Sequence, residues 1–245
     1  MKNLLLPKRT TGIFTAPRGT QFKYGPSKFG KPYGLVVPFD ENIDETCVSA
    51  VSKFMNDLGY LEIFTSPLNP REKNVFMNFG YATVETLILL KKSFDSPLPN
   101  NKSLRIHKIR QKDLEKILMI DHASFDSFWQ FDKTAFLNAK NATPYTRLRM
   151  IKEGKEIVAY AITGAGITDG FIQRLAVLPD FQNCGFGTYL LNDGLRWLQR
   201  KGVTNTWVNT QPANEAAINL YRKAKFEICE NELTVLSLST AINKT

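Results

Sequence analysis

The stretch Phe171-Ile-Gln-Arg-Leu-Ala-Val-Leu-Pro-Asp-Phe-Gln-Asn-Cys-Gly-Phe-Gly-Thr188 decides the fold, because it reads as a strand, a glycine-bearing turn and the start of a helix. This geometry directs several free backbone N–H groups to one point, with the positive end of a helix dipole behind them. Gly185 and Gly187 have no Cβ atom, so a ligand can approach the backbone closely. The stretch therefore predicts an anion site that suits a pyrophosphate, and it leaves the identity of the ligand open.

The elements around this turn alternate between strands and helices. Downstream, apolar periodicity predicts a helix over 186–201, a strand over 203–210, a helix over 215–225 and a strand over about 228–238. Upstream, it predicts a strand over 104–109, helices over 111–122 and 132–139, and a hairpin of 146–152 with 156–163. These elements indicate a domain of the α/β class, with helices on the faces of a mixed (α+β) sheet.

An internal repeat precedes this domain. Residues 65–85 align with residues 210–230 at a shift of 145 positions without a gap, and five of the 21 pairs are identical. The same order of elements is predicted over 33–39, 46–58, 60–66, 71–79 and 82–91. Where the second copy has its glycine turn, the first has the acidic run Pro38-Phe-Asp-Glu-Asn-Ile-Asp-Glu45, which would repel a phosphate. We interpret the first copy as a degenerate half domain, kept for packing or partner contact.

Four segments are expected along the chain. Residues 1–39 carry seven Lys or Arg and no Asp or Glu, and the first 32 lack clean periodicity, so 1–32 reads as a basic irregular arm. The degenerate copy follows over 33–95, a Pro- and Asn-rich linker over 96–103, and the domain with the glycine turn over 104–240. The arm is either a solvated tail or a contact for an anionic partner. Nucleic acid is not favoured, because no aromatic RNA-binding motif accompanies the charge.

The composition predicts a soluble chain with a real core, since 43% of its 245 residues are apolar and its net charge is +9. No apolar run approaches the ~20 residues of a membrane helix, and the three leucines before Pro7 are too few for a signal peptide. We therefore expect a cytoplasmic protein without a membrane partner. Three widely spaced cysteines argue against a disulfide framework, and two histidines without zinc spacing argue against a metal.

Three motifs follow one another in the second copy: Leu175-Ala-Val177, Gln182-x-x-Gly185-x-Gly187 and Asn214-x-x-Ala217-x-x-Leu220-Tyr221-x-x-x-x-Phe226. In this order they resemble the cofactor strand, the Q/R-x-x-G-x-G/A loop and the second cofactor motif of the GNAT superfamily of acetyl-CoA-dependent N-acetyltransferases. Residues 104–240 look most similar to the ribosomal-protein-alanine (protein N-terminal) acetyltransferases. The resemblance implies a GNAT acyl-CoA N-acyltransferase fold, preceded by a partial, degenerate copy, with acetyl-CoA as cosubstrate.

The resemblance also implies roles for named residues. The main chain of Leu175, Ala176 and Val177 would extend along the pantetheine arm, and an N–H there would polarise the thioester carbonyl. Backbone N–H groups of residues 183–188 would bind the pyrophosphate, within the motif Gln182, Asn183, Cys184, Gly185, Phe186, Gly187 and Thr188. Asn214 would hydrogen-bond the pantetheine arm, cap a helix, or do both. Cys184 is interpreted as a turn residue, with a nucleophilic or redox role as the alternative.

Tyr221 is the expected catalytic residue, because the reaction needs an acid that protonates the departing thiolate. Thiols have a pKa of ~8.5 and phenols of ~10, so a phenol is protonated at neutral pH and close enough in acidity to serve. The first copy has Phe76 at this position, which packs equally well but cannot donate a proton. The alternative interpretation of Tyr221 is a core aromatic residue in a short helix.

The sequence does not identify the general base. Asn209 stands where the ribosomal-protein acetyltransferases typically have a glutamate, and Gln173 stands where other members have an acid. Neither takes a proton. An amine with a pKa of ~8 is partly neutral already, so one alternative is a water chain that ends on a carbonyl or a remote carboxylate. Asp121, His122 and Asp126 lie in the region that borders the acceptor in this family, and we expect them to be surface or capping residues.

The leading hypothesis is an acetyl-CoA-dependent N-acetyltransferase that acts on a primary amine, either a protein N-terminus or a small molecule. A mycothiol-synthase-like activity is a further possibility, because that family also joins a degenerate copy to an active one. The alternative from another class is a catalytically weak acyl-CoA-binding sensor or assembly factor. The absent base and the basic arm favour the sensor, and Tyr221 disfavours it. The sequence discloses neither the acceptor nor the oligomeric state.

Overall fold

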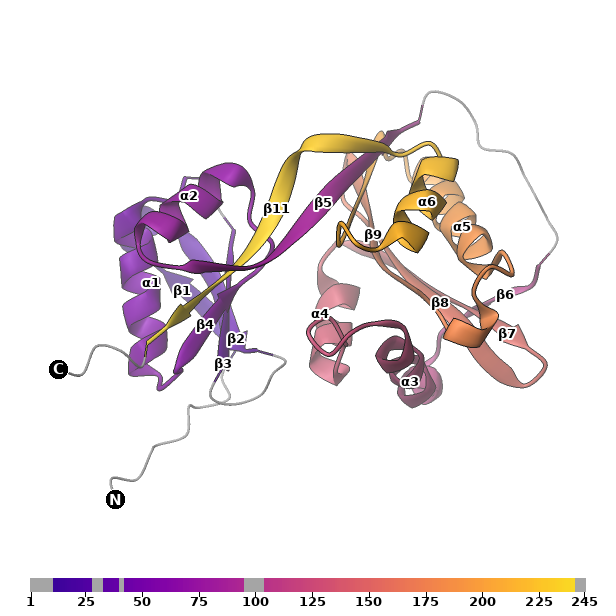
Figure 1. Ribbon diagram of the computed structural model, residues 1–245, viewed down its shortest axis with the longest axis horizontal. Coiled ribbons are helices and arrows are strands. Elements are labelled where there is room, and N and C mark those ends of the chain that lie inside the picture. The colour runs from indigo at the N-terminus through magenta and orange to yellow at the C-terminus, as the bar shows by residue number, and fades with distance from the viewer. Residues whose placement is uncertain (1–10, 28–32, 40–41, 95–103, 241–245) are drawn as a thin grey trace, which may run out of the picture. The chain divides into compact units, whose positions relative to one another are not determined.

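The computed structural model describes residues 11–27, 33–39, 42–94 and 104–240, and the chain divides into two compact units (Figure 1). The N-terminal unit comprises residues 1–88 and 230–245, and the C-terminal unit comprises residues 89–229. In the parts of the chain that the structure describes, no helix is both long enough and apolar enough to cross a membrane.

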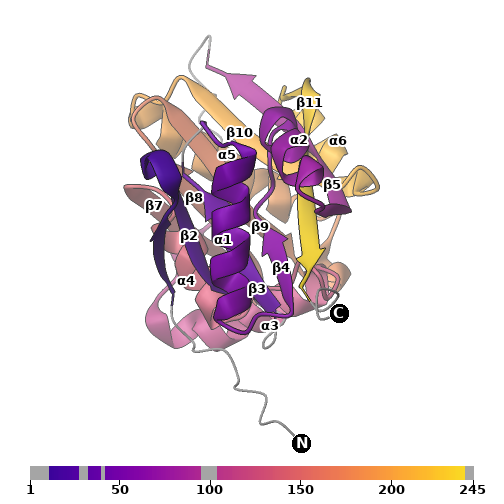
Figure 2. The ribbon, with the colours of Figure 1, turned by 90° about the vertical axis from the view of Figure 1, so that its left-hand side faces the viewer.

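The N-terminal unit is built from strands β1 (Gly12–Thr15), β2 (Gln21–Pro26), β3 (Tyr33–Pro38), β4 (Glu62–Thr65) and the last part of β11 (Glu227–Ser239), with helices α1 (Glu45–Asp57) and α2 (Pro70–Asn78). The first three strands pair antiparallel, β4 runs parallel to β3, and β11 runs antiparallel to β4. Helix α1 lies along one face of these strands (Figure 2), where Val48, Val51 and Met55 are fully buried.

The expected irregular arm over 1–32 is wrong for residues 12–26, which form the hairpin of β1 and β2. Phe14 lies opposite Phe22 in this hairpin, and Phe22 is fully buried in the core. Tyr24 shares that face and meets Phe54 of α1 edge to face. The apolar alternation covers only two or three positions in each strand, so it did not stand out among the Gly, Pro and Thr residues. Residues 1–10 and 28–32 of the predicted arm lie outside the described residues.

The C-terminal unit is built from strands β6 (Ile106–Lys108), β7 (Tyr145–Glu153), β8 (Glu156–Ala165), β9 (Asp169–Val177), β10 (Asn205–Thr210) and the end of β5 (Ala82–Ser93), with helices α3 (Leu114–Ser124), α4 (Lys133–Asn141), α5 (Phe186–Arg200) and α6 (Glu215–Lys223). The strand order is β5-β10-β9-β8-β7-β6, and β9 and β10 are parallel. One core lies under α5, and another lies under α3 and α4. The mixed sheet with helices on its faces is therefore the predicted α/β architecture.

The repeated segment has the predicted geometry in both units. Helix α6 begins and ends 145 positions after α2, and Asn69 and Asn214 each cap their helix through the side-chain oxygen. Each helix is followed by a residue with positive φ, Gly80 at 108° and Lys225 at 61°. The ring pairs also match, with centroids 5.0 Å apart for Phe76 and Tyr81 and 5.5 Å apart for Tyr221 and Phe226.

The units do not divide at the predicted boundaries of 95 and 104. Residues 89–93 at the end of β5 belong to the C-terminal unit, and residues 230–239 at the end of β11 belong to the N-terminal unit. Phe94 donates its N–H to the carbonyl of Thr204 at 3.2 Å, within the C-terminal unit. The end of β5, the last strand of the first copy, thus belongs to the C-terminal unit, and the end of β11, the last strand of the second copy, belongs to the N-terminal unit. The predicted linker 96–103 lies outside the described residues.

Candidate active site

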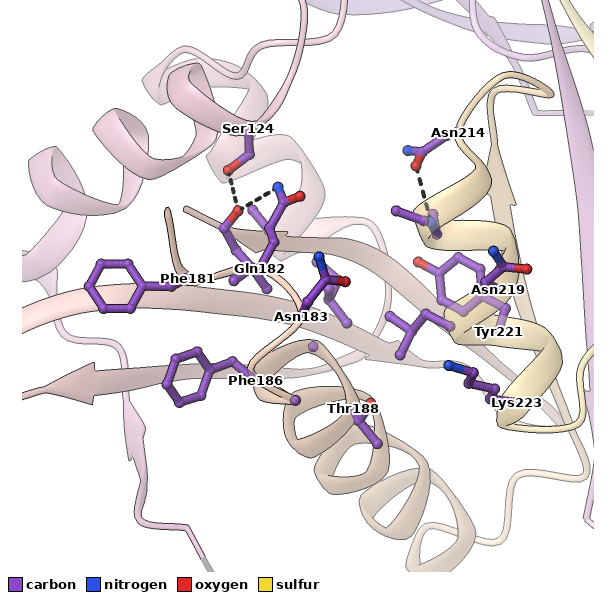
Figure 3. A pocket seen from close by; sticks show the side chains of 18 of the residues that line it. Ser124, Phe181, Gln182, Asn183, Phe186, Thr188, Asn214, Asn219, Tyr221 and Lys223 are labelled. Atoms are coloured by element: carbon purple, nitrogen blue, oxygen red, sulfur yellow. Dashed lines mark hydrogen bonds between the residues drawn. The ribbon is translucent and has the colours of Figure 1, made fainter. Parts of the chain in front are cut away.

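A cavity of about 500 Å³ opens in the C-terminal unit between β9, the N-terminus of α5 and helix α6 (Figure 3). Eleven of the twelve site residues expected from the sequence line it: Leu175, Ala176, Val177, Gln182, Asn183, Gly185, Phe186, Gly187, Thr188, Asn214 and Tyr221. The lining also includes Ser124 and Phe125, from a segment whose Phe-x-x-x-Trp pattern resembles the peptide acetyltransferases, and Lys223, which sequence reasoning missed. Cys184 is not among the lining residues. It is exposed, with its Sγ 3.5 Å from the carbonyl oxygen of Gln182, as suits a turn residue.

The turn before α5 takes a left-handed backbone at two positions, Asn183 with φ of 62° and Gly185 with φ of 84°. Glycine adopts this conformation without steric cost, which explains its place at the start of the helix. No side chain caps α5, so the first N–H groups of this helix are not satisfied by a capping side chain. Together with the helix dipole, these groups suit an anion in the cavity.

Gly187 lines the cavity in the first turn of α5, close to β9 and α6. A Cβ atom at this position would lie 3.4 Å from Cδ2 of Leu220 and 3.7 Å from side-chain atoms of Leu175 and Val177. These are ordinary van der Waals distances, so the first turn of α5, strand β9 and helix α6 pack closely here without excluding a methyl group.

Strand β9 presents an open edge to the cavity. Its parallel pairing with β10 covers only Asp169–Phe171 with Asn205–Trp207, so the two strands separate toward their carboxyl ends. A β-bulge lies at Gln173, because Ile162 faces Arg174 across the ladder while Thr163 faces Ile172. The backbone of residues 175–177 is left beside the cavity, where an extended ligand can add as a further strand.

One carbonyl on this edge is already occupied. The Ser124 hydroxyl donates to the carbonyl of Val177 at 3.1 Å, and Nε2 of Gln182 donates to the same oxygen at 3.2 Å (Figure 3). Gln182 therefore ties the turn to the end of β9. A ligand would pair with the remaining backbone groups of the strand.

Tyr221 lies on α6, is 5% exposed, and directs its hydroxyl toward the cavity (Figure 3). Burial raises the pKa of this phenol well above its usual value, and the positive charge of Arg174 offsets part of that rise. The hydroxyl is therefore protonated at neutral pH, and its raised pKa makes it a weaker acid toward a thiolate than an exposed phenol. Lys223, two residues after Tyr221 on the same helix, adds a positive charge to the lining.

Asn214 fulfils the capping role that the sequence allowed. Its Oδ1 accepts the N–H of Ala217 at 3.1 Å at the start of α6. This bond uses the oxygen of the amide and none of its N–H donors, and the residue also lines the cavity. The cap and a contact with the pantetheine arm are therefore compatible.

Asp121 was expected at the surface or at a cap, and this expectation is wrong. It is fully buried and forms an ion pair with Arg174, at 2.7 Å between Nε and Oδ2. An arginine in the middle of an apolar strand was the signal in the sequence that a buried acid would face it. His122 is exposed, and Asp126 accepts the N–H of Trp129 at 3.2 Å, so these two residues are as expected.

The cavity lining offers no evident general base. Among the described residues that line it, the ionisable side chains are Tyr221 and Lys223. Asn209 is exposed on β10, and Gln173 sits in the bulge of β9. The arrangement thus provides an anion site, an open strand edge and a proton donor, but no carboxylate or imidazole in the described lining.

The first copy has lost this opening. Its strands β3 and β4 stay paired up to Val36 with Thr65, and the N–H of Ser66 donates to the carbonyl of Val36 at 3.0 Å. Phe76, the counterpart of Tyr221, is fully buried. The edge that β9 presents in the C-terminal unit is therefore closed in β3.

The family model "Acetyltransferase (GNAT) family" matches residues 106–226, which include the turn and α6. The ribosomal protein bS18-alanine N-acetyltransferase of Haemophilus influenzae is 30% identical over 121 residues, covering 49% of this chain and 80% of that protein. The chain therefore belongs to the GNAT acetyltransferase family, an enzyme family whose cosubstrate is acetyl-CoA.

Two further likenesses extend over both units. The mycothiol acetyltransferase of Propionibacterium freudenreichii subsp. shermanii is 22% identical over 178 residues, covering 67% of this chain and 57% of that protein. A solved tandem GNAT protein from the clavulanic acid biosynthesis pathway has a TM-score of 0.64 at 10% identity, covering 89% of this chain and 78% of that one. The structural likeness shows the GNAT fold and is consistent with a two-part arrangement of the chain.

Proposed function

We propose that this protein transfers the acetyl group of acetyl-CoA to a primary amine, either a protein N-terminus or a small molecule. The observation that carries the proposal is that the open edge of β9, the turn before α5 and the hydroxyl of Tyr221 meet in one cavity. The three features correspond to the three parts of the cosubstrate: its pantetheine arm, its pyrophosphate and its thioester.

Binding would use mostly backbone groups. The N–H groups of residues 183–188 hold the pyrophosphate at the N-terminus of α5, and Lys223 adds a positive charge beside it. The pantetheine arm pairs with residues 175–177 and with the amide N–H of Asn214. Because Val177 has its carbonyl satisfied by Ser124 and Gln182, the strand edge is held in place before the ligand arrives.

The reaction follows from this placement. The amine attacks the thioester carbonyl, a C–N bond forms, and a backbone N–H of β9 stabilises the oxyanion of the tetrahedral intermediate. The intermediate collapses with cleavage of the C–S bond, and Tyr221 gives its proton to the departing thiolate. The attacking nitrogen of the intermediate loses its extra proton to solvent, and the Tyr221 phenolate takes a proton back from solvent. The products are the N-acetylated amine and free coenzyme A.

The proposed identity of the acceptor is supported by the relatives of this chain rather than by the shape of the cavity. The Haemophilus protein is named for the alanine of ribosomal protein bS18, which supports a protein N-terminus. An α-amino group has a pKa of about 8, so part of it is neutral at pH 7.5 without help from a base. This property suits a cavity whose described lining holds no carboxylate or imidazole.

The same missing base supports a second candidate, an acyl-CoA-binding sensor with weak turnover. The two are separated by turnover measurements with acetyl-CoA, peptides that begin with alanine, and small amines. Detectable acetylation by mass spectrometry supports the enzyme, whereas acetyl-CoA binding without any product supports the sensor.

Tyr221→Phe tests the acid directly. The substitution removes one hydroxyl from a buried ring, so the fold should persist while kcat falls by about 100-fold or more, because general acid catalysis is lost. The matched control is Tyr145→Phe on β7, an exposed tyrosine outside the cavity lining, whose kcat should equal that of the wild type. Full turnover by Tyr221→Phe would remove the acid role.

A further inference from the structure

A buried arginine contacts the segment 125–131, which lies between α3 and α4 and is also held by hydrogen bonds of Asp121, His122 and Gln130. Arg174 donates from Nε to Oδ2 of Asp121 at 2.7 Å and from Nη2 to Oδ1 at 2.8 Å. The side chain of Arg174 is 8% exposed and that of Asp121 is 0% exposed. This is a bidentate, buried ion pair, the geometry in which arginine gives the most directional restraint.

The carboxylate of Asp121 is satisfied on every side. The hydroxyl of Tyr160, from the neighbouring strand β8, donates to Oδ2 at 2.5 Å. The N–H of Phe131 donates to Oδ1 at 2.6 Å, which attaches the end of the segment to α3. Burial keeps the pKa of Tyr160 well above its ordinary value, so this phenol acts as a donor. A fully satisfied buried network defines one arrangement and resists alternatives.

Arg174 also contacts the segment itself at three places. Its Nη2 donates to the carbonyl of Trp129 at 2.7 Å. Its guanidinium carbon lies 3.4 Å from the ring centroid of Phe125 and 4.0 Å from that of Phe131. The beginning, the middle and the end of the segment therefore rest on one side chain of β9.

The start of this segment forms part of the wall of the cavity. Phe125 lines the cavity beside Ser124, the last residue of α3, whose hydroxyl donates to the carbonyl of Val177 on β9. Arg174 is followed directly by Leu175, the first of the residues expected to pair with the pantetheine arm. The anchor of the wall and the edge of the cofactor strand are thus adjacent residues.

We propose that Arg174 is a positioning residue, which fixes segment 125–131 against β9 so that Phe125 keeps its place in the wall of the cavity. The role of the wall rests on the proposed acetyl transfer. Lysine cannot replace the arginine here, because it has neither the planar fork for Asp121 nor a flat face to lie between two rings.

If Arg174 only stabilised the fold, Arg174→Lys would lower stability without a specific effect on segment 125–131. A second arginine–aspartate pair in the chain provides the control for that case. Arg147 of β7 donates from Nε and Nη2 to Asp193 of α5 at 2.7 and 2.9 Å. This second bidentate pair is partly buried, and neither member lines the cavity. Arg147→Lys therefore measures what the loss of such a fork does to stability alone.

The experiment compares wild type, Arg174→Lys, Arg147→Lys and the milder Tyr160→Phe in the full chain. Amide hydrogen exchange reports on residues 125–131, calorimetry gives the Kd for acetyl-CoA, and initial rates with a synthetic peptide that begins with alanine give KM and kcat. We expect Arg174→Lys to speed exchange in 125–131 and to raise the peptide KM by about tenfold or more, because a displaced wall misplaces the acceptor. The Kd for acetyl-CoA should rise by less than the peptide KM, because the turn before α5 and the edge of β9 lie outside the segment. Tyr160→Phe should shift exchange and KM in the same direction by less.

The outcomes separate this inference from the proposed function. Arg147→Lys should lower Tm without altering exchange in 125–131 or the peptide KM. Equal behaviour of Arg174→Lys and Arg147→Lys would overturn the inference, as would faster exchange with an unchanged KM in an active enzyme. A wild type that acetylates no peptide or small amine refutes the proposed function, while the exchange data still decide whether Arg174 holds the segment.

Discussion

At Gly185, an effect of substitution on stability can be distinguished from an effect on acetyl-CoA binding, because Gly202 provides a comparison. Its φ of 84° at the start of α5 costs an alanine roughly 1–2 kcal/mol, and its carbonyl and N–H stand beside the cavity. Gly202, after the other end of α5, has a φ of 80° with open space around it. An alanine would therefore meet the same backbone strain at either end of this helix.

Gly185→Ala should lower the free energy of unfolding by about as much as Gly202→Ala, because both place an alanine in the left-handed region. Only Gly185→Ala should weaken acetyl-CoA binding, since it disturbs the N–H groups that face the pyrophosphate. Chemical denaturation and calorimetry with acetyl-CoA measure the two quantities. Equal acetyl-CoA affinity in both variants would mean that the turn is not the pyrophosphate site.

At the scale of elements, α2 and α6 are two copies of one capped helix, of which α6 borders the cavity. Asn69→Ala and Asn214→Ala should each cost about 1 kcal/mol of stability, because each removes the oxygen that accepts an N–H of the first turn. Asn214→Ala should also lower the affinity for acetyl-CoA, whereas Asn69→Ala should not. If both variants bind acetyl-CoA as the wild type does, Asn214 is a cap and nothing more.

Elements with strong local signals could be predicted from the sequence. Helix α6 has an Asn cap, an apolar face and a clear end, and the turn before α5 has two glycines, so each is specified by residues close together in the chain. The pair of Asp121 and Arg174 could not be predicted, because it joins positions 53 apart through the fold. The hairpin of β1 and β2 was missed for a different reason: its apolar pattern is too short to exceed the turn-forming composition around it.

At the scale of the whole molecule, the boundary between the two units lies at a different place from the one that the sequence predicts. Composition placed the boundary at the Pro- and Asn-rich stretch 96–103, but strand pairing is a long-range property that composition does not report. The C-terminal unit includes residues 89–93, and Leu90 among them is fully buried. The Ser93 hydroxyl also donates to Oδ1 of Asn205, on β10, at 3.1 Å. A fragment cut at the compositional boundary would thus lose part of its own sheet.

A fragment of residues 104–229 should accordingly be less stable than one of residues 89–229. The shorter fragment exposes the edge of β10 and loses the buried side chain of Leu90, which alone is worth about 2 kcal/mol. An unpaired edge strand also invites association, so the shorter fragment should aggregate at lower concentration. Urea denaturation and light scattering of the two fragments check this, with Leu90→Ala in the longer fragment as the control for the lost side chain. If both fragments unfold at the same urea concentration and stay monomeric, the end of β5 is dispensable and the functional half begins at the compositional boundary after all.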